Sequence, residues 1–116
     1  MFRLTASTIV ALTLQLPAGA EVVGKWCDMP VPGMPSIDSV ITIQTNTEGK
    51  YSLLIVYADG SKTSSPVRRE GSRFFTDNDF GEFYSQKPDG RLSINDSDGF
   101  IRNAMPTQSG DPKACR

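Results

Sequence analysis

The side chains best suited to chemistry gather near the start of the chain. Residues 21–38 contain the only tryptophan, Trp26, together with Cys27, Met29 and Met34. Thiolates and thioethers are soft ligands for Cu(I), and a thiolate is also a nucleophile. The chain has no histidine, however, so the usual partner of a catalytic cysteine and the commonest zinc ligand are both missing. We expect neither a copper site nor a reactive Cys27.

Acidic loops form the second group of candidate ligands. Residues 77–82 and 95–99 gather carboxylates around glycine, as calcium loops do. Neither is an EF-hand, because the twelfth positions are Pro88 and Thr107, and turn chemistry is the plainer explanation of both loops. Asp79 and Glu82 could act as an acid and base pair, but a solvated loop is the simpler interpretation. We predict no enzymatic activity and no cofactor, and leave weak calcium binding open.

Two further segments are candidates for contact with another protein. One is the proline-rich connection of residues 29–36, which stiffens an extended chain and exposes apolar side chains. The other is a basic patch around the turn at residues 70–71, with a solvated hairpin tip as the alternative. The predicted contact residues are Met29, Val31, Met34, Arg68, Arg69 and Arg73.

The first twenty residues have the features of an export signal. A short positive start precedes the apolar run of residues 4–16, and Ala18 and Ala20 are the small residues that a signal peptidase recognises. The run is too short to span a membrane, which takes about 20 apolar residues. We predict removal of residues 1–20, a periplasmic or secreted product, and no membrane span after removal.

The remaining residues 21–116 are enough for one domain. Removing Arg3 leaves 11 basic residues against 13 acidic ones, so the net charge is −2. This mild charge argues against binding to nucleic acid. Cys27 and Cys115 are the only cysteines, and in an exported protein they most simply form one disulfide that joins the two ends of the domain.

Turn residues recur along the chain at the spacing typical of antiparallel β-proteins, and three of the turns contain Asp-Gly. Alternation predicts that Ile41 and Ile43 lie on the buried face of their strand and Thr42 on its solvent-exposed (wet) face. By the same rule, Phe83 is expected on the buried face and Tyr84 on the exposed face. Ser93 and Asn95 are likewise placed on a wet face. The predicted strands are residues 22–28, 39–45, 51–57, 62–69, 73–76, 82–86, 91–95 and 100–104.

Eight short sequential strands with tight turns favour an all-β meander that closes, or nearly closes, into a small barrel. A two-sheet sandwich is the alternative, although sandwiches need long crossing connections and this chain has only residues 29–36.

One short motif resembles a known family. Gly24-Lys25-Trp26 is similar to the Gly-X-Trp with which lipocalins and other calycin-type barrels begin their first strand, and Arg102 matches an arginine that packs over that tryptophan. The resemblance implies a barrel that either carries a small apolar ligand or, as in small exported inhibitor barrels, binds a protease. For the carrier, the expected interior residues are Trp26, Tyr51, Leu53, Ile55 and Phe100.

Two functions therefore follow from the sequence. The first is an exported module that contacts another extracytoplasmic protein, including as an inhibitor of a hydrolase. The second is a lipocalin-like carrier of a small apolar ligand. We favour the first here, because 96 residues (116 minus 20) can barely fill their own barrel and leave no obvious void.

Overall fold

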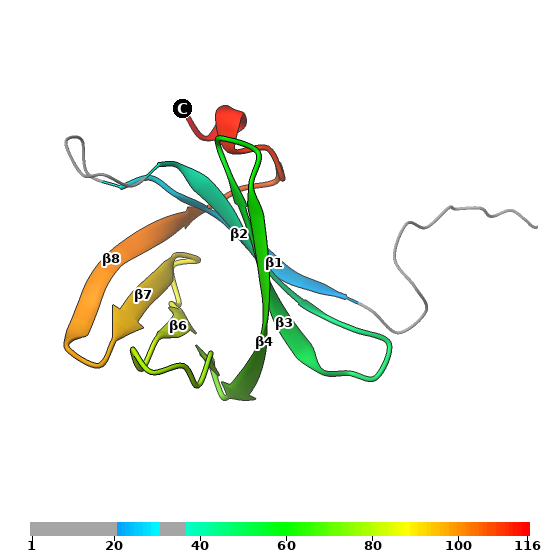
Figure 1. Cartoon of the computed structure of the whole chain (residues 1–116), viewed down its shortest axis with the longest axis vertical. Coiled ribbons are helices and arrows are strands. Elements are labelled where there is room, and N and C mark those ends of the chain that lie inside the picture. The colour runs from blue at the N-terminus through cyan, green and yellow to red at the C-terminus, as the bar shows by residue number, and fades with distance from the viewer. Residues whose placement is uncertain (1–20, 31–36) are drawn as a thin grey trace, which may run out of the picture.

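The computed structural model describes residues 21–30 and 37–116, and its eight antiparallel strands form one closed meander (Figure 1). The predicted all-β barrel is confirmed, and the sandwich alternative is wrong. The expected strand bounds differ from the observed ones by at most two residues. The strands are β1 (Val22–Asp28), β2 (Ser39–Thr45), β3 (Tyr51–Tyr57), β4 (Lys62–Glu70), β5 (Arg73–Phe75), β6 (Phe83–Gln86), β7 (Leu92–Asp96) and β8 (Gly99–Pro106), followed by a short 3₁₀ helix, η2 (Pro112–Cys115).

The barrel is tightly paired at one end and splayed at the other. Strand β4 pairs with β3 through residues 62–67 but with β5 only through residues 68–70. Strand β8 pairs with β7 from Gly99 to Ala104, but with β1 only at Met105 and Pro106. The sheet of β1 to β4 and the sheet of β5 to β8 therefore separate toward the end that carries residues 58–61, 76–82 and 97–98, which we call the mouth.

The hydrophobic core fills the closed end and the middle of the barrel. Trp26 is 3% exposed, and its indole Nε1 donates a hydrogen bond of 2.9 Å to the carbonyl of Gly90. Gly24 leaves room for the ring, because a Cβ there would lie only 2.5 Å from Cη2 of Trp26. This close approach gives a physical reason for glycine two residues before tryptophan on the same face of β1. The other buried residues of the core are Ile41, Ile43, Leu53, Val67, Phe74, Tyr84, Leu92, Ile94 and Ala104.

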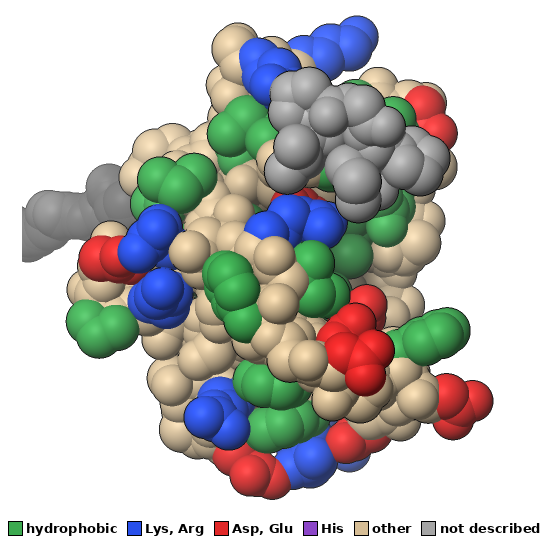
Figure 2. All heavy atoms as spheres, turned by 90° about the vertical axis from the view of Figure 1, so that its left-hand side faces the viewer, with side chains coloured by type: hydrophobic (Ala, Val, Ile, Leu, Met, Phe, Trp, Pro, Cys, Tyr) green, Lys and Arg blue, Asp and Glu red, His purple; other side chains and the backbone are tan. Residues whose placement is uncertain are grey.

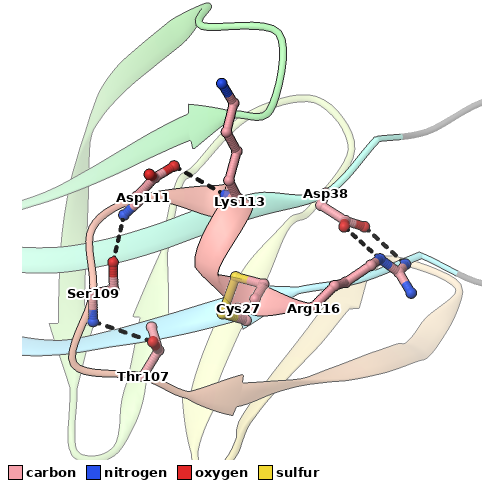
Figure 3. Close-up of a disulfide and its surroundings, with 8 residues drawn as sticks. Cys27, Asp38, Thr107, Ser109, Asp111, Lys113 and Arg116 are labelled. Atoms are coloured by element: carbon pink, nitrogen blue, oxygen red, sulfur yellow. Dashed lines mark hydrogen bonds and ion pairs between the residues drawn. A yellow bond between two sulfur atoms is a disulfide. The ribbon is translucent and has the colours of Figure 1, made fainter.

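The C-terminal tail crosses the outside of the barrel. Cys27 follows Trp26 in β1 and so points outward, where it bonds Cys115 across a Cα–Cα distance of 5.8 Å. The helix η2 packs against β2, and the amide of Thr107 donates to the carbonyl of Lys25. Figure 3 shows the disulfide beside the ion pair in which Arg116 donates to Asp38 at 2.6 and 2.9 Å. The predicted disulfide is confirmed.

Two predictions about the sheet faces are wrong. Thr42, Ser93 and Asn95 were expected on wet faces, yet each is at least nine-tenths buried. Tyr84 rather than Phe83 points into the core, because the register places Tyr84 opposite Ile94 and Phe74, both of which face inward. Phe83 lies on the outer side, where its ring stacks on Phe75. Strict alternation of apolar and polar residues cannot identify the inner face when aromatic residues occupy both sides.

Candidate functional site

A half-open cavity of about 980 Å³ lies at the mouth, between the two separated sheets. Its apolar part consists of inward-facing residues of β2, β3 and β7, chiefly Ile41, Leu53, Ile55 and Ile94. Strand β4 contributes the hydroxyls of Thr63 and Ser65 on its inward face, since these residues pair with Ile55 and Leu53. The rest of the lining is Asp28, Ile37, Ser39, Tyr57, Asp59, Ser61, Pro66, Thr76, Asn78, Glu82, Tyr84, Ile101 and Arg102.

An ion pair closes the gap between β1 and β8 beside this cavity. Arg102 donates from Nε to Asp28 Oδ1 at 2.6 Å and from Nη2 to Oδ2 at 2.7 Å. The backbone ladder between these strands stops at Cys27, so the side-chain pair continues the link where the main chain cannot. The Asp28 carboxylate raises the pKa of Arg102 above its usual value. Both charges are thus satisfied by each other.

Two hydroxyl groups in the cavity wall lack protein partners among the described residues. Tyr84 is 4% exposed and Ser39 is 2% exposed, and both line the cavity. Neither hydroxyl forms a hydrogen bond with residues 21–30 or 37–116, and both residues line the cavity. Burial raises the pKa of the Tyr84 phenol, so it stays protonated at neutral pH. Each hydroxyl can therefore donate to, or accept from, a molecule in the cavity.

The cavity lining contains more acidic than basic side chains. Asp28, Asp59 and Glu82 supply three carboxylates, whereas Arg102 supplies the one guanidinium. Hydrogen bonds from the hydroxyl and the amide of Ser61 hold the pKa of Asp59 below its usual value, so this carboxylate is ionised at neutral pH. Because Asp28 and Arg102 cancel, the remaining charge of the lining is negative.

The expected carrier residues separate into three groups. Leu53 and Ile55 line the cavity. Trp26 and Tyr51 belong to the packed interior, where Tyr51 meets Phe74 edge to face. Phe100 was expected inside, but it is 61% exposed and does not line the cavity, so this prediction is wrong.

The resemblance also implied that Arg102 packs over Trp26. Instead the guanidinium forms the pair with Asp28, while the indole Nε1 is bonded to Gly90. The expected arginine therefore joins β8 to β1 at the side of the mouth rather than covering the ring.

The arginines of the predicted basic patch have partners within the barrel. Arg68 donates to Asp77 at 3.0 and 2.8 Å and also pairs with Glu70. Arg69 bonds the hydroxyl of Tyr51 at 3.0 Å and lies over that ring. The guanidinium of Arg73 is 5.5 Å from the centre of the Phe83 ring. All three arginines are thus engaged within the chain, and Arg68 links β4 to the loop of residues 76–82 at the mouth.

The proline-rich connection lies mostly outside the described residues. Met29 is half-buried, whereas Val31 and Met34 fall in the undescribed residues 31–36. Within the described residues, no group of three or more acidic, cysteine or histidine side chains could hold a metal ion. The calcium alternative therefore gains no support from the described residues, and the copper alternative depends on Met34, which lies outside them.

The rim of the mouth exposes large hydrophobic side chains, of which only Phe100 was named from the sequence, and it was placed in the interior. Phe80 is 72% exposed and Phe100 is 61% exposed, with Ile37 and Ile101 also at the rim. The loop of Phe80 is joined to the turn that precedes β8, because the amide of Ser97 donates to the carbonyl of Phe80 at 2.9 Å. Figure 2 shows acidic and hydrophobic side chains next to each other on one face of the molecule.

Comparison of the chain with protein-family models, with curated proteins and with solved structures gives no match. The site therefore has to be interpreted from its own geometry. This geometry offers an apolar floor, two hydroxyls in the wall that have no partner among the described residues, and a negative rim.

The disulfide is consistent with an oxidising, extracytoplasmic compartment. In the part of the chain that the structure describes, no helix has the length and apolar character that crossing a membrane requires. Residues 1–20 lie outside that part.

Proposed function

We propose that this protein is an exported binding module that holds a small amphipathic molecule in the mouth of its barrel. The observation that carries the proposal is the cavity of about 980 Å³, which has an apolar floor and convergent polar groups. Ligand pockets in proteins typically measure roughly 300 to 1,000 Å³ and combine an apolar lining with a few placed polar groups.

The cavity reverses the preference reached from the sequence. A contact module was favoured there because the chain was expected to fill its own barrel. The core does fill the closed end, but the two sheets separate beyond Leu53 and Ile94, and side chains do not fill the space between them. The lining is also more polar than that of a carrier for a purely apolar ligand, since hydroxyls and carboxylates surround the floor.

The proposed place of action is the periplasm or the exterior of the cell. The signal-like residues 1–20 and the disulfide support this location. In such a place the module would take up its ligand from solution or from another extracytoplasmic molecule.

The test uses 1-octanol, an uncharged probe of the apolar floor, and isothermal titration calorimetry. Ile55→Trp fills the cavity from β3, whereas Leu54→Trp adds the same ring to the outer face of the same strand and is the matched control. We expect the wild type and L54W to bind and I55W to lose at least about tenfold in affinity, because a filled pocket leaves no space for the chain. Equal binding by all three proteins would refute the proposal.

A second function is favoured by the exposed rim. Phe80 and Phe100 are the most exposed large hydrophobic residues that the structure describes; Phe80 lies on a loop of the mouth and Phe100 lies at the start of β8. Clusters of exposed aromatic residues are typical of surfaces that contact other proteins. We therefore retain contact with an extracytoplasmic protein, including inhibition of a hydrolase, as the alternative. For any partner that co-purifies, Phe80→Ser with Phe100→Ser should abolish the complex while 1-octanol still binds.

A further inference from the structure

We infer that the molecule held in the mouth is an amphipathic cation, with its apolar part on the isoleucine and leucine floor and an ammonium group among the acceptors of Glu82, Asp59 and Tyr84. The inference rests on the proposed function and adds the chemical class of the ligand.

The charges of the lining support a cation. Glu82 and Asp59 remain after Asp28 and Arg102 are paired, and among the described residues neither is joined to a basic side chain. The loops that carry Glu82 and Asp59, residues 76–82 and 58–61, contain no lysine or arginine. Clefts lined by one sign of charge raise the local concentration of ligands of the opposite sign.

The hydrogen-bonding groups of the wall fit the same ligand. An ammonium group has three N–H donors and no acceptor, so it needs several oxygen atoms around it. The buried hydroxyls of Tyr84 and Ser39 have no partner among the described residues and line the cavity. Glu82 accepts one bond of 3.3 Å from Asn78, and its carboxylate has room for more. Burial raises the pKa of Tyr84, and the negative charges of Glu82 and Asp28, which line the same cavity, act in the same direction.

An anionic head group would meet a different situation. The one cation of the lining, Arg102, already makes two short bonds to Asp28, whose side chain is only 10% exposed. A ligand carboxylate that took this place would leave Asp28 unpaired and largely buried, which is unfavourable. It would also approach Glu82 and Asp59, so repulsion would add to the loss of the pair.

The experiment compares three ligands with the same chain and different heads: octylammonium, 1-octanol and octanoate. Calorimetry is done near neutral pH at low ionic strength, where screening is weak, and repeated at about 1 M salt, where the Debye length is about 3 Å. The variants are Glu82→Gln at the mouth and Glu48→Gln in the turn between β2 and β3, which removes the same charge from the opposite end of the barrel.

We expect wild type to bind octylammonium at least about fivefold more tightly than octanoate at low salt, with the difference shrinking in high salt. E82Q should lower the affinity for octylammonium severalfold and leave that for 1-octanol unchanged, while E48Q should match the wild type for all three probes.

The experiment distinguishes failure of the cation inference from failure of the proposed function. If 1-octanol binds but octanoate binds as well as octylammonium, or if E82Q changes nothing, the inference about the cation is wrong and the cavity remains a ligand site. If none of the three probes binds, both the inference and the proposed function are wrong.

Discussion

Loss of the disulfide provides a quantitative test of how the barrel is held closed. Changing Cys27 and Cys115 to serine frees the tail from the outer face of β1 and β2. The bond joins residues separated by 88 positions, so it restricts almost the whole unfolded domain. We expect a large loss of stability that arises mainly in the unfolded chain.

The magnitude follows from the length of the closed loop. For a separation of 88 residues, the chain-entropy relation gives a stabilisation of about 4.6 kcal/mol at 25 °C. The remaining contacts of the tail are few: the bond from Thr107 to Lys25, the buried Pro112 and the pair of Arg116 with Asp38. We expect a loss of about 4 kcal/mol, equivalent to roughly 15 to 30 °C in Tm for a domain of this size.

Urea unfolding followed by the fluorescence of Trp26, which is buried and the only tryptophan, measures the effect. A chain that ends at Pro106 and carries Cys27→Ser is the control. It should lie within about 1 kcal/mol of the double serine variant, because so few contacts hold the tail once the bond is gone. A loss below about 1 kcal/mol in the double variant would refute the loop-closure reasoning.

Two further predictions concern single residues of the interior. Gly24→Ala should lower the free energy of unfolding, measured in urea, by about 1 to 3 kcal/mol, because its Cβ would lie 2.5 and 2.7 Å from carbons of the Trp26 ring. The control is Gly110→Ala, whose Cβ would have no atom within 4 Å and which should change the free energy of unfolding by no more than about 0.5 kcal/mol. Equal losses in the two variants would contradict this explanation. Above pH 10 the phenol of Tyr84 loses its proton in the unfolded chain but keeps it in the folded protein. The free energy of unfolding should therefore fall by up to about 1.4 kcal/mol per pH unit, and Tyr84→Phe should reduce this dependence on pH. If the free energy of unfolding changes with pH between 10 and 11 by the same amount in Tyr84→Phe and in the wild type, burial does not hold the phenol neutral.

The strands could be predicted because local signals set them. The Asp-Gly turns and the short β-prone runs between them fixed eight strands to within two residues, and the cysteine count fixed the disulfide. The faces were harder to predict. Tyr84 faces inward because of its register with Ile94, and register depends on pairing across the barrel rather than on the residues of β6 alone.

The cavity could not be predicted from residue types, because it depends on where the ladders stop. Strand β8 leaves β1 after two paired residues and β4 changes partner near Val67, and neither event has a signature in the sequence. One signal was present: Thr63 and Ser65 alternate along β4 on the face that should meet the core. Inward hydroxyls in a strand of a small barrel indicate an interior that is open to water or to a ligand.

The pairing of Arg102 with Asp28 was likewise hidden. The two residues are 74 positions apart and became neighbours only because β1 and β8 close the barrel. Sequence reasoning placed Arg102 over Trp26 on the strength of a resemblance, and the structure uses it at the mouth instead.

The most direct measurement is a map of where 1-octanol binds, made from the backbone amide shifts in ¹H–¹⁵N NMR spectra of the disulfide-bonded protein. Binding in the mouth predicts that the largest shifts occur at Ile41, Leu53, Ile55, Tyr84 and Ile94, while Ile43 and Leu92 at the closed end hardly move. Shifts confined to the outer face or to the C-terminal tail, or no shifts at a saturating concentration, would contradict a ligand site between the separated sheets.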